Sequence, residues 1–183
     1  TSIFEMWKNR IPWRMFLMLS ATFTSMILTD FENILAAQAG LVAFIPMLMG
    51  TGGNSGAQAS TAVIRSLSLG DTEPRDVLRV MWKEWRVSLI CGLTLAVVNF
   101  VKMLLVDGLL LQNANVTVAV AATVSLSIVF IVMFAKVVGS VLPIAAEKMG
   151  VDPAVMSNPL ISTLTDAVSL LIYIYVAKLV LHI

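Results

Sequence analysis

The stretch VMSNPLISTLTDAVSLLIYIYVAKLV, residues 155–180, decides the fold class because it is long, apolar and nearly free of charge. As a helix, rising about 1.5 Å per residue, it is long enough to cross the hydrocarbon core of a membrane. The whole chain has the same character: 58% of its 183 residues are hydrophobic, 13% are charged, and its mean hydropathy is +0.92. A soluble domain has a charged share of about 25%. The sequence therefore predicts a membrane protein.

Five apolar segments predict an all-α membrane protein with five transmembrane helices in a single domain, residues 1–183. The predicted spans are residues 12–35, 39–66, 76–106, 116–149 and 153–181. Pro12 suits the first turn of the first helix, whereas the run GTGGNSG, residues 50–56, is expected to interrupt the second helix because glycine is a poor helix former. Five spans of about 20 residues leave no room for a soluble enzyme domain.

Basic residues lie mostly on one side of the predicted bundle. Nine of the twelve lie around the start of the first span, the connection of the second and third, or the connection of the fourth and fifth: Lys8, Arg10, Arg14, Arg65, Arg75, Arg79, Lys83, Arg86 and Lys148. The tryptophans at positions 7, 13, 82 and 85 gather on the same side, as membrane-interface anchors do. The positive-inside rule then predicts a cytoplasmic N-terminus and a C-terminus outside the plasma membrane.

Several classes of function have no support in the sequence. A net charge of +1 gives no sign of a nucleic-acid partner. Cys91 is the single cysteine, so one chain cannot form a disulfide or a thiolate metal site. Neither a His-Glu metal motif nor a serine paired with a base is recognisable, and we expect no enzyme.

Asp166 is the residue that points to a function. It lies seven residues after Pro159, about 10 Å along a helix, and an ionised carboxylate at such depth is expected to face the protein interior or water. At 100° per residue, a sector about 100° wide gathers side chains with oxygen or nitrogen atoms: Asn158, Ser162, Thr165, Asp166 and Ser169. Two partners remain open for the carboxylate, namely Lys136 of the fourth segment or a bound cation.

Carboxylate, amide, hydroxyl and carbonyl oxygens, without thiolate or imidazole, suit a hard cation. Mg²⁺, Ca²⁺ and Mn²⁺ are the divalent candidates. A single carboxylate is a sparse ligand set for a bare divalent ion. We therefore expect either a homodimer with two copies of Asp166 or an ion that keeps its water, as Mg²⁺ often does.

The stretch FIPMLMGTGGNSGAQAS, residues 44–60, carries four glycines in an apolar region. The simpler interpretation is that they let neighbouring helices approach closely. Pro46, the weak helix-forming run at residues 52–54 and the polar side chain of Gln58 favour another, in which broken backbone lines an aqueous path. The stretch has no Gly-Lys-Ser/Thr ending, so it is not a nucleotide-binding loop. It is a candidate pore wall.

Two motifs together resemble a known family. PMLMGTGGNSGAQASTAVIRSLSLGD, residues 46–71, followed later by NPLISTLTDAVSLLIYIYVAK, residues 158–178, closely resembles the membrane domain of the MgtE family of magnesium channels. The glycine-rich stretch alone would be a weak signal, but the two motifs in this order and at this spacing are specific. The match covers nearly the whole chain.

The resemblance implies a homodimer with a central ion pathway lined by the second and fifth helices of both chains. Asp166 corresponds to the family's central ion-binding aspartate, which acts on hydrated Mg²⁺. Asn158 corresponds to the family's asparagine eight residues earlier, and Ser162 stands where the family offers a backbone carbonyl to the ion.

Pore-lining residues are expected from both motifs. Gly50, Gly53 and Asn54 fall on the family's glycine pattern, and Ala57 departs from the asparagine or serine that often follows it. Thr165 and Ser169, from the polar sector of the fifth segment, complete the expected lining. Bacterial members also carry a cytoplasmic N-terminal domain and paired CBS domains that sense Mg²⁺, and residues 1–11 resemble the end of the helix that connects them to the membrane.

We expect a channel or facilitator that conducts hydrated Mg²⁺, and other divalent cations where selectivity allows, through the lipid bilayer into the cytoplasm. A secondary transporter that exchanges a divalent cation for Na⁺ or H⁺ is the alternative, since an interrupted helix and one intramembrane carboxylate suit it too. A third interpretation is a scaffold in which Asp166 merely pairs with Lys136.

Overall fold

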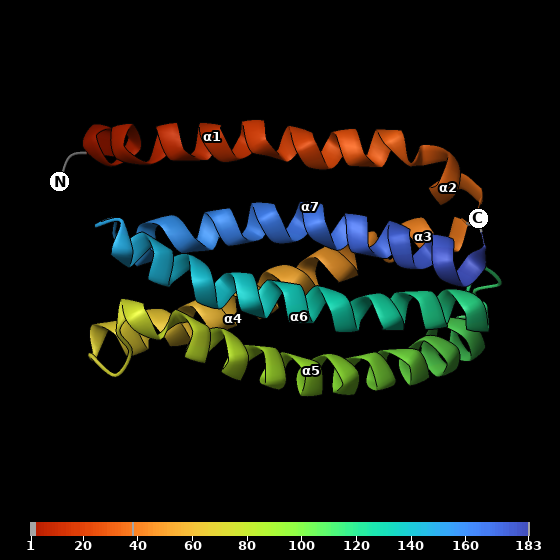
Figure 1. Ribbon diagram of the computed structural model, residues 1–183. Coiled ribbons are helices and arrows are strands. Elements are labelled where there is room, and N and C mark those ends of the chain that lie inside the picture. Colours follow the sequence, from red (N-terminus) through yellow and green to blue (C-terminus); the bar gives the residue numbers. More distant parts are fainter. Residues whose placement is uncertain (1–2, 38, 183) are drawn as a thin grey trace.

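The structure is a computed structural model that describes residues 3–37 and 39–182, without the side chains of residues 9, 10, 13, 37, 39 and 154–159. Within these ranges the chain is helical and has no strand, which confirms the all-α class (Figure 1). The elements are α1 (Ile3–Asp30), α2 (Glu32–Ala37), α3 (Ala39–Val42), α4 (Ile45–Ser68), the 3₁₀ helix η1 (Pro74–Asp76), α5 (Val77–Lys102), the π-helix η2 (Met103–Leu110), α6 (Val118–Lys148) and α7 (Pro153–Leu181).

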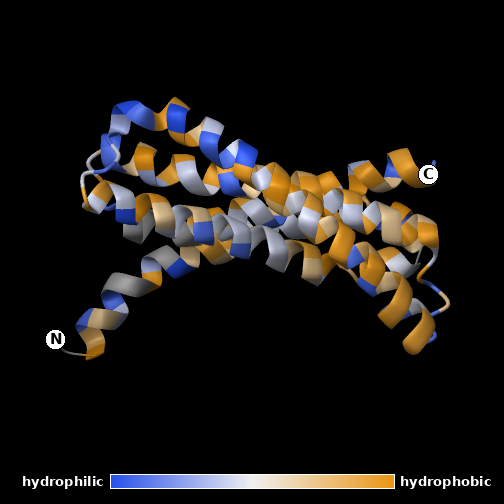
Figure 2. Cartoon of the chain, turned by 90° about the horizontal axis from the view of Figure 1, so that it is seen from below, coloured by the Kyte–Doolittle hydropathy of each residue, from blue (hydrophilic) through white to orange (hydrophobic). Residues whose placement is uncertain are grey.

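α6 is the central helix of the bundle. It packs against α4, α5 and α7, and α4 also packs against α7, while α1 lies along the outer side of α7 (Figure 1). The α4–α5 and α6–α7 connections lie at the end of the bundle that holds the N-terminus (Figure 1). Hydrophilic residues gather at that end, and the N-terminal end of α1 points away from the other helices (Figure 2). The connections that carry most of the basic residues are therefore together in space.

Three helical stretches in the described part of the chain are long and apolar enough to cross a membrane: Pro74–Leu110, Val118–Lys148 and Leu160–Leu181. They correspond to the third, fourth and fifth predicted spans, and α7 has the predicted bounds, 153–181. The stretches predicted as the first two spans are less apolar. A bundle with five membrane spans therefore stays a prediction.

The first helix includes residues 3–11, which were expected to end a connecting helix, and it differs from the prediction in the place of Pro12 and at its C-terminal end. α1 begins at Ile3 and contains Pro12 in its interior, not in its first turn, and it ends at Asp30, before the separate helix α2. The residues before Pro12 include good helix formers such as Glu5 and Lys8. A proline removes one backbone hydrogen bond to the preceding turn, and the turns on either side remain helical here.

The second predicted segment is interrupted, but not at the glycine run. α4 is continuous through residues 50–56, and the break lies at the turn of Ala43 and Phe44, between α3 and α4. Pro46 sits in the first turn of α4, where a missing backbone N–H costs little. Pro46 therefore marks the start of the helix that carries the glycines and does not accompany a break within it.

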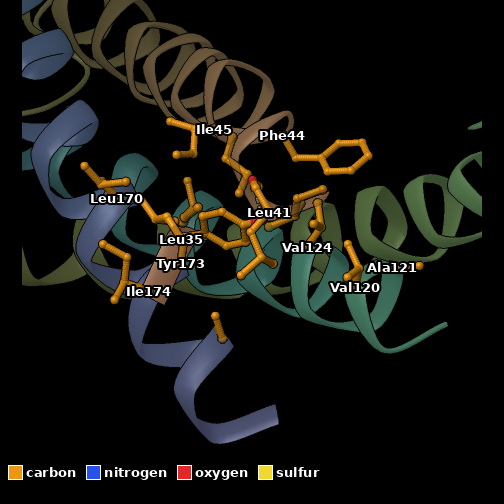
Figure 3. Packing of buried hydrophobic residues seen from close by; sticks show 14 of the residues in the cluster. Leu35, Leu41, Phe44, Ile45, Val120, Ala121, Val124, Leu170, Tyr173 and Ile174 are labelled. Atoms are coloured by element: carbon orange, nitrogen blue, oxygen red, sulfur yellow. Dashed lines mark hydrogen bonds between the residues drawn. The ribbon is translucent and has the colours of Figure 1, made fainter. Parts of the chain in front are cut away.

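A cluster of buried apolar residues lies where α3, the start of α4, α6 and α7 converge (Figure 3). Its centre is a pair of fully buried residues, Leu41 of α3 and Tyr173 of α7, and the Tyr173 hydroxyl donates a hydrogen bond of 2.8 Å to the Leu41 carbonyl. The short helix α3 has few backbone partners of its own, so this bond fixes it to α7.

The far end of α5 continues as the π-helix η2 and is tied to the start of α4. A π-helix has hydrogen bonds between residues five apart, which brings Lys102 and Asp107 near each other, and their charged atoms Nζ and Oδ2 are 2.7 Å apart. Lys102 Nζ also lies 5.8 Å from the centre of the Phe44 ring, in the turn before α4. Contacts from Lys102 of α5 and Tyr173 of α7 thus hold the turn and short helix that precede α4.

Candidate ion pathway

The oxygen-bearing side chains of α7 divide into an open pair and a buried pair. Ser162 is exposed and Asp166 is half-buried, whereas Thr165 and Ser169 are buried inside the chain. Asn158 belongs to the same predicted sector, and its side chain lies outside the residues that the structure describes. Ser162 and Asp166, four residues apart, therefore form the polar edge of α7.

Thr165 satisfies its hydroxyl within α7. Its Oγ1 donates to the carbonyl oxygen of Ile161 at 2.7 Å and also lies 3.0 Å from that of Ser162. The Ser162 carbonyl is the one that the resemblance assigns to the ion. A carbonyl oxygen has a second lone pair, so this contact leaves it able to accept a further bond.

Two glycines of the motif form a seam between α4 and its neighbours. A Cβ placed on Gly52 would lie 2.6 Å from Ser169 Oγ and 3.0 Å from Ile131 Cγ2, and one on Gly56 would lie 2.5 Å from Ile161 Cγ2. These spaces are too small for a larger residue. The close-packing interpretation is therefore confirmed for Gly52 and Gly56, which are one turn apart.

Gly139 completes the seam from α6. A Cβ at this position would meet the backbone of Gly56, including its carbonyl oxygen. The α4 and α6 backbones touch at this point, with no side chain between them. This contact holds the glycine motif in helical form next to α7, because α7 packs against both α4 and α6.

Gly50 and Asn54 lie on the open side of α4, and Gly53 lies at the border between that side and the contact with α7. A Cβ on Gly50 would meet nothing within 4 Å, and one on Gly53 would meet only Thr165 Oγ1, at 4.0 Å. Asn54 is exposed. The structure thus brings Gly50, Gly53 and Asn54 together on one face and separates them from the packing glycines.

A groove of about 710 Å³ continues this open face towards the end of α4. Its lining comes entirely from α4 and consists of Asn54, Ala57, Gln58, Thr61, Ala62 and Arg65. We call the surface formed by Gly50, Gly53 and these six residues the polar face of α4. A Cβ on Gly53 would face Thr165, the residue before Asp166. This face therefore adjoins the polar edge of α7.

A second groove, of about 470 Å³, lies between α4, α5 and α6. Asn54 and Gln58 line this groove as well, and they share it with Thr51, Thr94 and Lys136. Asn54 and Gln58 therefore lie between the two grooves and border both.

Lys136 does not pair with Asp166 in the described part of the chain, where the ion pairs are Arg75–Glu73 and Lys102–Asp107. The structural pairing that the sequence left open for Asp166 is thus not formed. The same part of the chain contains no group of three or more histidine, cysteine, aspartate or glutamate residues that could hold a metal ion.

Gln58, Thr61 and Arg65 belong to the polar face, and the predicted site did not include them. They follow Asn54 at intervals of four, three and four residues, the spacing of one helix face. This spacing is visible in the sequence. It indicates one polar helix face only if the helix is continuous through residues 50–56, where the glycines predicted a break.

Comparisons with known proteins agree with the motifs. A model of the MgtE family, described as a divalent cation transporter, matches residues 45–176. Three proteins named magnesium transporter MgtE are similar to the chain. The one from Thermus thermophilus is 43% identical over 177 residues, the one from Bacillus subtilis 33% over 174, and the one from Enterococcus faecalis 28% over 171.

The alignments cover 97%, 95% and 93% of this chain and 37%, 37% and 36% of the respective relatives. The chain thus spans little more than a third of the length of the curated relatives it matches. The family model includes both α4, with its glycine motif, and Asp166. Because that model matches most of the sequence, the chain belongs to the MgtE family of divalent cation transporters.

Proposed function

We propose that this chain forms the ion pathway of a channel that conducts hydrated Mg²⁺ across the plasma membrane into the cytoplasm. One observation carries the proposal: the polar edge of α7, with Asp166 and Ser162, adjoins the polar face of α4 in a chain that is otherwise strongly apolar. Intramembrane carboxylates are costly, and they commonly mark the path of an ion.

A homodimer would complete this pathway. The polar face of α4 includes exposed Asn54, Gln58 and Arg65, and such a face is unfavourable against lipid. A second copy related by a two-fold axis would present the same face and cover it. Two Asp166 carboxylates would then lie on opposite sides of one axis.

Mg²⁺ is the cargo that these groups suit best. Its hydration shell is hard to remove, so proteins often hold it through water with one or two carboxylates. Two Asp166 side chains and the hydroxyl and carbonyl of Ser162 offer oxygen ligands, and Gly50 and Gly53 leave width for the water molecules. The three similar proteins named magnesium transporters also support this cargo.

Regulation would belong to the full-length protein. We propose that cytoplasmic domains, joined to the N-terminal end of α1, control the pathway in the manner implied by the family. Residues 3–11 are helical and continuous with the rest of α1, so a movement of such domains could reach the bundle through this helix.

The proposal is tested by Asp166→Asn in the full-length protein, reconstituted into liposomes that contain a Mg²⁺-sensitive dye. Asparagine keeps the size of the side chain and removes its charge. We expect Mg²⁺ influx driven by a membrane potential to fall at least tenfold, because the carboxylate is the charged ligand of the path. Asp71→Asn, an exposed residue in the α4–η1 turn, is the matched control and should retain the full flux.

Retained and selective flux in Asp166→Asn would remove this carboxylate from the mechanism. The same liposomes distinguish a channel from an exchanger. Influx through a channel follows voltage with equal Na⁺ and H⁺ on both sides, whereas influx that requires an imposed Na⁺ or H⁺ gradient would identify an exchanger.

A further inference from the structure

Lys136 is a charged residue in the middle of α6 that the proposed pathway does not use. It is half-buried and lines the groove of about 470 Å³ between α4, α5 and α6. The groove's other lining residues are uncharged, and they include Thr51, Asn54 and Gln58 of α4. A lysine in a membrane segment is expensive unless its ammonium group reaches polar partners or water, and this groove provides polar side chains around it.

Lys136 stands at the same depth as the proposed ion site. It lies twelve residues before Lys148, the end of α6, and Asp166 lies thirteen residues after Pro153, the start of α7. At 1.5 Å per residue these are distances of about 18 and 20 Å from the short α6–α7 connection. The two helices run side by side from that connection (Figure 1), so the two charges lie at nearly one level.

Asn54 lies at this level too, and it borders the groove that contains Lys136. It lies fourteen residues before Ser68, the end of α4, which is about 21 Å along the helix. Its side chain, with that of Gln58, lines both the Lys136 groove and the open groove of the polar face. An ion at the polar face would therefore lie beside two amide side chains that also border the Lys136 groove, within reach of the field of Lys136.

No ion pair reduces the field of Lys136 in the described part of the chain. Lys136 makes no ion pair with any residue that the structure describes, and the charged residue of the adjoining groove, Arg65, is also basic. A positive charge near a cation path raises the free energy of a divalent ion twice as much as that of a monovalent ion.

We propose that Lys136 sets the affinity of the pathway by weakening divalent-cation binding at the level of Asp166. Conduction requires an ion site that binds strongly enough for entry and weakly enough for release. Two carboxylates in a dimer would hold Mg²⁺ tightly, and the two Lys136 ammonium groups offset part of that attraction. This inference rests on the proposed function, since it concerns the ion that Asp166 holds.

The test is Lys136→Met in the full-length protein, with Mg²⁺ influx into liposomes measured over a range of Mg²⁺ concentrations. Methionine has a similar length and no charge. We expect the half-saturating concentration to fall on the order of tenfold, with a maximal rate that is unchanged or lower because release slows. Lys136→Arg retains the charge and should keep the original half-saturating concentration.

Lys178→Met is the matched control. Lys178 is also a lysine of a long apolar helix, but it lies near the opposite end of the bundle, over the Phe31 ring at 4.9 Å. Its removal should leave the half-saturating concentration unchanged. Lys136→Gln, which keeps a polar group in the groove, provides a second neutral variant with the same expected fall.

An unchanged or increased half-saturating concentration in both neutral variants, in protein that elutes as one species in gel filtration, would overturn the proposal. A fall in Lys136→Arg equal to that in Lys136→Met would also overturn it, because the effect would then follow from shape and not charge. If Asp166→Asn abolishes flux while the Lys136 variants resemble the wild type, only this inference fails. If Asp166→Asn also leaves flux intact, the pathway itself is misplaced.

Discussion

Gly52 and Gly53 are neighbours in sequence and meet opposite surroundings. A Cβ on Gly52 would strike Ser169 and Ile131, whereas one on Gly53 would come no closer than 4.0 Å to Thr165. The first glycine allows helices to approach, and the second widens an open face. One motif thus serves both the packing of helices and the proposed pathway, and the helix period separates the two roles.

A glycine of the packed seam and a glycine of the open face should respond to alanine with opposite changes in stability. Gly139→Ala places a methyl group against the backbone of Gly56, which cannot rotate away. We expect the unfolding free energy to fall by about 1–3 kcal/mol, the usual cost of overpacking. Gly50→Ala adds a methyl group where nothing lies within 4 Å, and the higher helix propensity of alanine should stabilise the protein by up to about 1 kcal/mol.

Thermal unfolding in detergent, followed by tryptophan fluorescence, compares the two variants under equal conditions. Each substitution adds the same methyl group to a helix, so the comparison controls for propensity and size. A midpoint for Gly139→Ala at or above that of Gly50→Ala would contradict the seam described above.

At the residue scale, the depth of Asp166 could be predicted from the sequence, but the burial of the side chains around it could not. The depth of the carboxylate follows from helix rise, and the polar sector follows from the helix period. The position of α4 decides which side chains of that sector are buried. The helix period of α7 does not predict where α4 lies. Thr165 and Ser169 are buried against α4, where Gly52 and Gly56 leave room for them. Their place in the lining of a pore stays a prediction.

At the scale of elements, the break before α4 was misplaced because propensity was weighed without packing. Glycine costs a helix about 1 kcal/mol per residue relative to alanine, which made residues 50–56 the expected break. The contacts of Gly52 and Gly56 with α6 and α7 override that cost. The true break, at Ala43 and Phe44, is set by long-range contacts from Tyr173 and Lys102, and local sequence does not reveal them.

The bond from Tyr173 to Leu41 predicts that α3 depends on one hydroxyl of α7. Tyr173→Phe keeps the ring in the core and leaves the buried Leu41 carbonyl without this donor. We expect a loss of about 0.5–1.5 kcal/mol in unfolding free energy, the net contribution of one hydrogen bond, because the Leu41 carbonyl still accepts a bond of 3.3 Å from the Phe44 backbone N–H. Amide hydrogen exchange should rise in α3 and in the first turn of α4.

Tyr175→Phe is the control for this prediction. Tyr175 lies on the same helix two residues later, is 68% exposed, and has no hydrogen bond to a described residue. Its exchange pattern and thermal midpoint should equal those of the wild type. Equal behaviour of the two variants would show that the hydroxyl of Tyr173 does not hold α3.

At the scale of the whole molecule, composition and charge predicted more than any single motif. A charged share of 13% indicated a membrane bundle, and the basic loops indicated a common side. The structure places the α4–α5 and α6–α7 connections at one end with the N-terminus (Figure 1). Which end faces the cytoplasm, and whether α1 and α4 cross the membrane, depend on the lipid environment as well as on the fold.

Five spans with a cytoplasmic N-terminus predict alternating sides for three exposed positions along the chain: Lys8, Glu32 and Asp71. Single cysteines at these positions, in a Cys91→Ala background that retains Mg²⁺ flux, can be labelled in intact cells with a membrane-impermeant maleimide. We expect labelling from outside at Glu32→Cys alone, because α1 and α4 would each cross the bilayer once. The other two should react only after the cells are permeabilised.

The pattern of labelling distinguishes the possible topologies. If only the three more apolar stretches cross the membrane, Glu32→Cys lies on the same side as Lys8→Cys and Asp71→Cys, and the three positions react alike. A reversed orientation would expose Lys8→Cys and Asp71→Cys and protect Glu32→Cys. The proposed pathway needs α4 to cross the bilayer, since its polar face is half of the route, so labelling of all three positions from one side would overturn the pathway together with the five-span topology.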